Sequence, residues 1–543
     1  MQLLSFFEKK RASLWVALFF LAMTLVGVVT SFDYGHNFDA VSELDILQAN
    51  IYEYAYQILG EEHSFTQYLA WRGYSRVAFY HDRCHGQSAM YLAAPLLKVE
   101  RIARDWFRPV WNMYTFLLFM AGVCSVYAAC RNMKFSRMIS CVAAFMMYIT
   151  PRFFAEGHYN TKDLALLSLI LLTVWQGFRF LRKPCLVRGL LFSLVGAMAT
   201  NTRIAGFLAW GLVGASAIGM RFAKKDWSWR MVGVAASTVV SFFVFFILVT
   251  PASWDNIPAF FPYFLNNSVR FQSWDGFVLF RGQLFQPTVE PLPWDYLPAV
   301  MMMTLPLYTF PLLFAGQVLT VKKWFCAKTD FFRNEQMVMR LIITFLWLIP
   351  LLLWLCLRPL VYNSWRHFYF MYAGIALMVG CGIHDLFAAV KEKNTGKKIL
   401  GGGVALCLLI STVGVWMNHP YQYGYYNPLV PRPLENTYEL DYWEVSTVSA
   451  LQKLYDMRDS LLHPLYIQGG DYLTSSAIRG KMMMPYDVRS KLNFQPDGVA
   501  PYVLYNTMYS AVYGASYPPE GYHELFRIKS YGNVLCIMYE KNP

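Results

Sequence analysis

Stretches of about 20 mostly apolar residues recur along this 543-residue chain, and they constrain its fold more than any other feature. A helix of that length crosses the hydrocarbon core of a bilayer. The composition agrees, because only 15% of the residues are charged, where a soluble chain carries about a quarter. We predict a polytopic α-helical membrane protein with about 11 transmembrane helices, at about 12–32, 109–130, 138–152, 163–181, 189–200, 204–220, 231–251, 296–320, 340–358, 368–390 and 399–417.

The first apolar stretch follows Lys9, Lys10 and Arg11, as the core of a secretory signal peptide would. Such a core is about 7–15 residues long and precedes a small-residue cleavage site. Here the run is longer and continues into Ser-Phe-Asp-Tyr-Gly-His. We therefore expect an uncleaved first span.

The basic residues predict the orientation of the chain. When the spans alternate from a cytoplasmic N-terminus, the loops assigned to the cytoplasm are all rich in Lys and Arg and poor in acids, as the positive-inside rule requires. The net charge of +13 is thus a topology signal, and no nucleic-acid partner is expected. We expect a multi-pass protein of the cell membrane whose C-terminus is extracytoplasmic.

This topology divides the chain into a transmembrane domain at 1–417 and an external domain at 418–543. Two large loops of the first domain, at about 33–108 and 252–295, face the same side as the tail. Apolar residues in the first loop recur at helical spacing, which predicts an amphipathic helix lying at the membrane interface. In the tail, "PLYIQGG", "YVLYNTM" and "NVLCIMYEK" predict short strands of a small α/β domain.

A carboxylate follows the first span closely, at Asp39 in "HNFDAVSELD". Near the outer membrane surface it could act as a general base on an acceptor hydroxyl. Asp is also a common N-cap residue, so Asp39 could instead cap the following helix. Glu43 and Asp45 are further carboxylates nearby, for which solvation on a helix surface is the simpler account.

Polar residues gather at the external ends of several spans. The stretch "FFAEGHYNTKD" at 153–163 holds Glu156, His158, Asn160 and Lys162 between apolar runs. Cations also stand in "TNTRIAGF" and "NSWRHFYF", namely Arg203, Arg366 and His367. Snorkelling toward lipid headgroups would account for one such cation. An anionic, lipid-linked ligand would account for all of them together.

The loop "YHDRCHGQS" raises the question of a metal. His81, Asp82 and His85 are residue types that bind divalent cations, but their spacing matches no specific metal motif. An ordinary hydrogen-bonded loop is the alternative. We predict no definite cofactor and leave a divalent metal open.

Five sequence motifs, and the order in which they occur, resemble those of one family of membrane enzymes. They are "PRFFAEGHYNTKD", "TNTRIAGF", "WDGFVLFRG", "NSWRHFYFMYAG" and "NHPYQYGYYNPL" with "YELDYWEVS". They are similar to those of bacterial GT-C-fold glycosyltransferases of the dolichyl-phosphate-mannose protein mannosyltransferase-like family. The resemblance implies transfer of a sugar from a polyprenyl-phosphate donor to an extracytoplasmic glycan, lipid or protein acceptor, usually with inversion.

The resemblance also implies roles for individual residues. Asp39 takes the position of the catalytic base; relatives typically show Asp-Glu where this chain reads Asp39-Ala40, and Glu43 is the carboxylate that would substitute. The residues expected to bind the donor phosphate are Arg203, Arg366, His367 and Lys162. Those expected to line the substrate pocket are Glu156, His158, Asn160, His85, Gln87 and Asp275.

Two other functions remain open. A non-enzymatic transporter or scramblase of polyprenyl-linked sugars would also need external cations, together with a comparable polar site on the cytoplasmic side. A catalytically silent scaffold could bind glycan through its aromatic tail.

Overall fold

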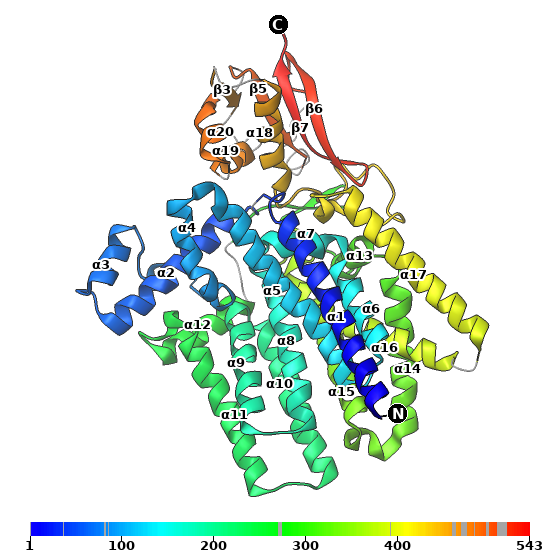
Figure 1. The fold of residues 1–543 in the computed structure, drawn as a ribbon. Coiled ribbons are helices and arrows are strands. Elements are labelled where there is room, and N and C mark those ends of the chain that lie inside the picture. The colour runs from blue at the N-terminus through cyan, green and yellow to red at the C-terminus, as the bar shows by residue number, and fades with distance from the viewer. Residues whose placement is uncertain are drawn as a thin grey trace.

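The computed structural model describes residues 2–35, 37–80, 83–84, 86–269, 274–390, 393–458, 463–468, 475–482, 484–495, 499–507 and 518–543. Within these ranges, eight helical segments are long and apolar enough to cross a membrane. They belong to α1 (Gln2–Thr30), α5 (Arg104–Asn132), α8 (Asp163–Arg182), α10 (Ala205–Lys224), α11 (Trp229–Leu248), α15 (Glu335–Leu357), η5 (Arg366–Met371) with α16 (Tyr372–Ala389), and α17 (Asn394–Met417). Figure 1 shows them as the long helical body of the molecule.

Three further predicted spans are shorter or bent. Helix α9 (Leu186–Thr202) is apolar but short, α6 (Arg137–Tyr148) meets α7 (Pro151–Tyr159) at 69°, and α13 (Tyr296–Thr304) meets α14 (Thr309–Ala327) at 116°. Both bends fall at a proline, Pro151 or Pro306, where the ring removes a backbone donor and disfavours helix in the preceding residue. Every predicted span thus has a helical counterpart, and the polytopic architecture is confirmed.

Close helix packing depends on small residues where α14 and α16 meet. A Cβ at Gly316 would lie 2.3 Å from the Met378 carbonyl oxygen, and one at Gly382 would lie 2.2 Å from that of Leu312. Neither position leaves room for a larger side chain. Within a bilayer, where apolar lipid removes the hydrophobic drive to associate, such close backbone contact is a main source of helix association.

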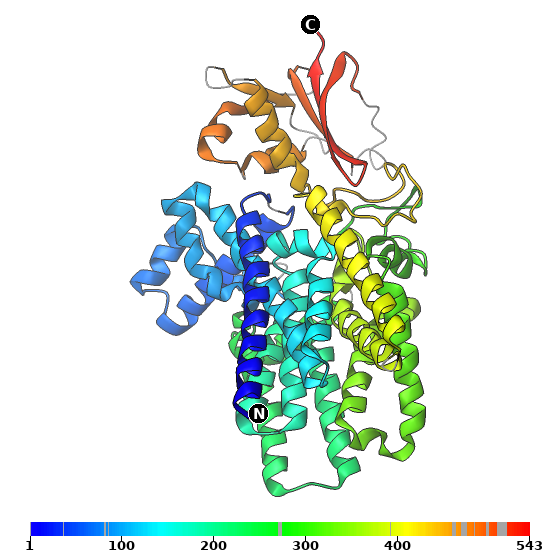
Figure 2. The ribbon, with the colours of Figure 1, turned by 45° about the vertical axis from the view of Figure 1, so that its right-hand side comes forward.

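The first large loop is helical, as predicted. It consists of α2 (Ala40–Leu59), α3 (Ser64–Trp71), η1 (Val77–Phe79), η2 (Ser88–Leu96) and α4 (Leu97–Ile102). The second loop holds η3 (Pro251–Ser253), α12 (Ile257–Val269) and a hairpin of β1 (Val278–Phe280) and β2 (Gln283–Phe285). Figures 1 and 2 place α2, α3 and α4 toward the end of the helical body that carries the C-terminal domain, away from the N-terminus.

The tail forms a small α/β unit around a mixed sheet of order β4-β3-β5-β7-β6. Strands β3 (Leu465–Gln468), β5 (Tyr502–Asn506) and β7 (Asn533–Lys541) confirm the three predicted strands. The remaining elements are η6 (Gln422–Gly424), α18 (Val445–Met457), α19 (Ser475–Met482), α20 (Tyr486–Lys491), β4 (Leu492–Gln495) and β6 (Tyr522–Ser530). Leu451 and Leu454 of α18 pack in one apolar cluster with Ile467, Leu504 and Met538 of the sheet.

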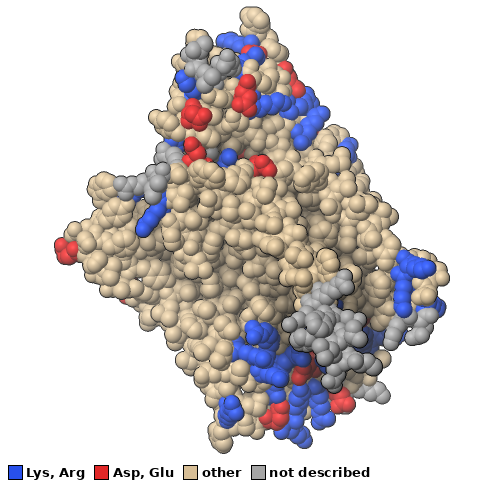
Figure 3. Space-filling view, in the orientation of Figure 1, with Lys and Arg blue, Asp and Glu red and all other residues tan. Residues whose placement is uncertain are grey.

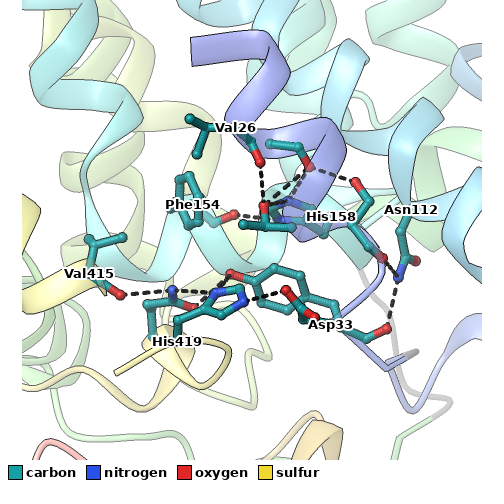
Figure 4. A network of polar contacts seen from close by, with 12 residues as sticks. Val26, Asp33, Asn112, Phe154, His158, Val415 and His419 are labelled. Carbon is teal, nitrogen blue, oxygen red and sulfur yellow. Dashed lines mark hydrogen bonds and ion pairs between the residues drawn. The ribbon is translucent and has the colours of Figure 1, made fainter. Parts of the chain in front are cut away.

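Polar contacts join the start of the tail to the end of α1 (Figure 4). His419 Nε2 lies 2.8 Å from the Asp33 carboxylate, and the Tyr34 hydroxyl donates to Gln422 at 2.8 Å. The Tyr34 ring stacks on His158 of α7 with centroids 4.1 Å apart. The start of the tail is therefore held against the residues that follow α1, and these in turn pack on α7, which forms most of the polar stretch at 153–163.

Charged side chains avoid the middle of the visible face in Figure 3. Lys, Arg, Asp and Glu gather toward the two ends, and a broad band of other residues separates them. A band of this kind is what a bilayer requires of the surface that it covers.

The predicted orientation can be tested by cysteine labelling in intact cells, using a variant that lacks the ten native cysteines. A cysteine at the exposed Lys529 in β6 should react with an impermeant maleimide. A cysteine at the exposed Lys398, near the start of α17, should react only after the cells are permeabilised. The reverse pattern would place the C-terminal domain in the cytoplasm.

Candidate active site

An ion pair between Asp39 and Arg366 lies at the centre of the candidate site. Arg366 Nη1 donates to Asp39 Oδ2 at 2.8 Å. The Arg366 side chain is only 3% exposed, whereas that of Asp39 is 33% exposed. Asp39 directly precedes α2 but makes no capping hydrogen bond through its side chain, so the helix-cap hypothesis does not explain this carboxylate.

Asp163, the first residue of α8, extends this pair into a chain of alternating charges. Its Oδ2 lies 3.9 Å from Arg366 Nη1, and its Oδ1 lies 2.8 Å from Arg203 Nη2. Asp163 is 2% exposed and Arg203 is 21% exposed. Residues from four distant parts of the sequence therefore meet in one cluster.

Both arginines of this cluster, Arg366 and Arg203, have a hydrogen-bond donor without an acceptor among the described residues. In each of them this donor is the buried Nε atom. A buried donor without a partner costs about 1–3 kcal/mol, and more when it is charged. A phosphate oxygen is the kind of acceptor that such guanidinium groups bind.

Lys162 and Glu43 complete the cluster of charges. Glu43, on the first turn of α2, is buried and accepts a hydrogen bond from the Thr161 hydroxyl. Lys162 precedes α8, and its positive charge is close enough to lower the pKa values of Asp39 and Glu43. The cluster thus contains three cations, Lys162, Arg203 and Arg366, and three carboxylates, Asp39, Glu43 and Asp163.

These surroundings separate the pKa values of the two candidate bases. Burial alone would raise the pKa of Asp39, but Arg366, with help from Lys162 and Arg203, outweighs it and holds the pKa below its ordinary value. Burial and the neighbouring Asp39 charge raise the pKa of Glu43 to about 7. Burial and Arg203 lower the pKa of Lys162. At neutral pH Asp39 is ionised, whereas Glu43 is partly protonated.

A second polar layer lies behind this cluster and was only partly predicted. Asn160 Nδ2 donates to Glu156 Oε2 at 2.8 Å and to Asp163 Oδ2 at 3.4 Å, so it connects the two layers. Glu156 Oε1 accepts from the hydroxyls of Tyr369 at 2.7 Å and Tyr442 at 2.8 Å. Glu156 is fully buried and serves as the meeting point of α7, η5 and the segment before α18.

Arg152 was missed as a site candidate, although it stands beside Pro151 in one of the motifs. It is 1% exposed, donates from Nη1 to the Ser364 hydroxyl at 2.9 Å, and has no partner for Nη2 among the described residues. Glu439 Oε2 accepts from the Ser364 backbone at 2.7 Å. A cation within an apolar run was the available signal, and only the fold shows that it turns inward.

The remaining predicted residues, His367 of the phosphate site and three of the substrate pocket, occupy varied positions. His367 contacts the ring of Tyr362, which also lies against the Arg366 guanidinium. His158 is buried between Tyr34 and Phe116 and bonds the Thr30 hydroxyl at 3.1 Å, so it packs against α1 (Figure 4). Gln87 is buried, and the backbone N–H groups of its neighbours Gly86 and Ser88 donate hydrogen bonds to Asn201. Asp275 is exposed.

The metal hypothesis rested on His81, Asp82 and His85, which lie outside the described residues. Within the described part of the chain, no group of three or more His, Cys, Asp or Glu side chains is arranged to hold a metal ion. The charge cluster at Asp39 pairs its carboxylates with arginines and a threonine hydroxyl.

Comparison with known proteins yields structural neighbours alone. No protein-family model and no curated protein sequence matches the chain. Two solved structures of ArnT from Cupriavidus metallidurans, one in the apo state and one bound to undecaprenyl phosphate, are neighbours of this chain at 12% sequence identity. Both alignments cover 97% of this chain and 98% of ArnT, with TM-scores of 0.46 for the apo structure and 0.44 for the bound one.

The raised pKa of Glu43 makes a prediction about stability. The folded protein holds the Glu43 proton up to about pH 7, whereas an unfolded chain releases it near the ordinary value of 4.5. Stability contributed by the neutral group is therefore complete below pH 4.5 and is lost as pH rises through 7, with a slope of at most about 1.4 kcal/mol per pH unit.

Glu43→Gln, which keeps the shape of the neutral side chain, should remove this loss. Between pH 5 and 7.5, the apparent melting temperature of the purified variant should fall less than that of the wild type. Parallel pH profiles for the two proteins would show that Glu43 is already ionised throughout this range.

Proposed function

We propose that the protein is a membrane glycosyltransferase that takes a sugar from a polyprenyl-phosphate donor and passes it to an extracytoplasmic acceptor. The observation that carries this proposal is the ion pair between Asp39 and the buried Arg366, set within a cluster of three cations at one end of the helical body. A carboxylate beside several cations supports this proposal, because such a group could serve as a base next to a phosphate leaving group. The proposed carrier belongs to the same chemical class as the undecaprenyl phosphate bound by ArnT.

The donor phosphate would bind where Arg366 and Arg203 converge on Asp163. Both guanidinium groups have a buried Nε atom without a partner among the described residues. The rings of Trp443 and Tyr362 lie 4.6 and 4.8 Å from the Arg366 guanidinium carbon and shield it from water. A guanidinium in a partly dry site stabilises the negative charge that develops on a leaving phosphate, because little water screens the interaction.

Asp39 would act as the base for the incoming hydroxyl. The acceptor oxygen attacks the anomeric carbon from the face opposite the phosphate, and its proton passes to Asp39. The bond between the anomeric carbon and the phosphate oxygen breaks, and its electron pair leaves with the carrier phosphate. A single displacement of this kind inverts the anomeric configuration.

Donor binding would also activate the base. In the structure, Arg366 lowers the pKa of Asp39, which weakens this carboxylate as a proton acceptor. A phosphate that draws Arg366 toward itself, and adds a negative charge nearby, would raise the Asp39 pKa again. Asp39 would therefore become a stronger base only when the donor is in place.

Asp39→Asn tests the role of the carboxylate, because Asn keeps the size of the side chain but cannot accept a proton at neutral pH. The variant should insert and bind donor, yet release carrier phosphate about 100- to 10,000-fold more slowly. The measurement is release of free polyprenyl phosphate by purified protein from a panel of polyprenyl-phosphate sugars, with water standing in for the acceptor.

Asp255→Asn is the matched control. Asp255 also pairs with an arginine, lying 2.6 Å from Arg76, and its side chain is 47% exposed. This substitution should leave the rate within about twofold of the wild type. An active Asp39→Asn protein would reject Asp39 as the base and direct attention to Glu43. If the wild type moves donor across liposome membranes but releases no carrier from any donor, the transporter alternative is favoured.

Arg366→Gln tests the phosphate site. Loss of a charge-assisted contact of about 1.5–3 kcal/mol should weaken donor binding by roughly 10- to 150-fold. Affinity can be measured with undecaprenyl phosphate by the change in intrinsic tryptophan fluorescence, since Trp443 lies against Arg366. Arg458→Gln, which breaks an ion pair with Glu540 in the C-terminal domain, should leave affinity unchanged. Unchanged binding in Arg366→Gln would mean that this arginine only holds Asp39.

A further inference from the structure

A second cluster of cations surrounds a groove at the other end of the helical body. The groove has a volume of about 580 Å³ and lies among the ends of α14, α15 and α16 and the turn after α5. From Arg366 to His384 the chain forms η5 and α16, a rise of about 27 Å, so this groove is remote from the candidate active site. It is lined by Met133, Phe135, Leu319, Lys322, Lys323, Cys326, Ala327, Gln336, Met337, Arg340 and His384.

The groove holds more positive than negative charge. Lys322 is exposed, Lys323 is 39% exposed, and Arg340 is 4% exposed. The carboxylate that faces them is Asp385, which is 3% exposed. Arg340 binds it through Nη1 at 2.9 Å and Nη2 at 2.8 Å, and Lys323 Nζ lies 2.5 Å away.

The single negative charge of Asp385 therefore balances only one of its two cationic partners, Arg340 and Lys323. Lys322 adds a further positive charge. Other acids near this end are engaged elsewhere. Glu335 lies 3.7 Å from Arg182 and 3.6 Å from Lys224, and Asp330 lies 3.3 Å from Arg333. The groove thus keeps an excess of about two positive charges, counting three cations against one carboxylate.

Apolar side chains line much of the rest of the groove. Leu319 and Met337 come from α14 and α15, and Phe135 stacks on His384 with ring centroids 4.3 Å apart. An exposed cation above an apolar lining suits a ligand with a charged head and a hydrocarbon body. Basic pockets between transmembrane helices are known to bind the head groups of anionic lipids.

We propose that this groove is a binding site for an anionic glycerophospholipid, with its phosphate between Lys322 and Lys323 and its acyl chains along the apolar lining. The site is independent of the proposed transferase activity. The apolar lining and the position of the groove at the end of the membrane-spanning helices favour a lipid over a free phosphate. The Arg340–Asp385 pair is buried in the wall of the groove and fixes its geometry, while the more exposed lysines contact the phosphate.

Lys322→Ala tests this site without disturbing the buried pair, because Lys322 has no ion-pair partner among the described residues. The full-length protein is delipidated, and titrated with phosphatidylglycerol or phosphatidylcholine in the same detergent. Bound lipid is counted by native mass spectrometry. The wild type should retain phosphatidylglycerol in preference to phosphatidylcholine, and Lys322→Ala should lower its affinity for phosphatidylglycerol about fivefold.

Lys398→Ala is the matched control, since Lys398 is an exposed lysine near the start of α17 and outside the groove. It should not change phosphatidylglycerol affinity. Equal losses in the two variants, or no preference of the wild type for the anionic lipid, would overturn the proposal. Displacement of phosphatidylglycerol by millimolar inorganic phosphate would also overturn it, and would assign the site to a soluble phosphate compound.

Discussion

A guanidinium group buried to 3% exposure must have a counter-charge, and for Arg366 that requirement organises the candidate site. Asp39 approaches from the start of α2, Asp163 from the start of α8, and Arg203 from the end of α9. None of these charges is stable in a dry environment without the others. Electrostatic interactions as well as packing therefore hold the first large loop against the membrane helices.

The same end of the molecule also carries the junction with the C-terminal domain. The buried Asp441 accepts hydrogen bonds from Tyr423, Ser446 and, at 2.9 Å, Asn506 of β5. Burial raises the pKa of Asp441 to about 7, although these hydrogen bonds oppose the shift. Together with the contact between Glu156 and Tyr442, they fix the tail directly behind the charge cluster. The C-terminal domain thus contributes to the wall of the site.

Much of this was predictable from the sequence, because apolar length and charge placement are local properties. They located the spans, the helix after Asp39, three strands of the tail, and the cations Lys162, Arg203 and Arg366. Contacts between distant residues were not predictable in the same way. Arg152 was not singled out in the sequence and is buried, while His158, expected in the substrate pocket, packs against α1. Tyr369, Tyr442 and Glu439 carried no local signal, since aromatic and acidic residues are common beside membranes.

In the proposed mechanism, the donor phosphate draws Arg366 away from Asp39 and so activates the base. The most direct test compares the pH dependence of kcat/KM, which reports the base in the free enzyme, with that of kcat, which reports it in the donor complex. The comparison should be made in Glu43→Gln, which removes the carboxyl group whose pKa is about 7. We predict that the acid limb of the kcat profile lies at a higher pH than the acid limb of the kcat/KM profile. Limbs at the same pH, or in the opposite order, would contradict it.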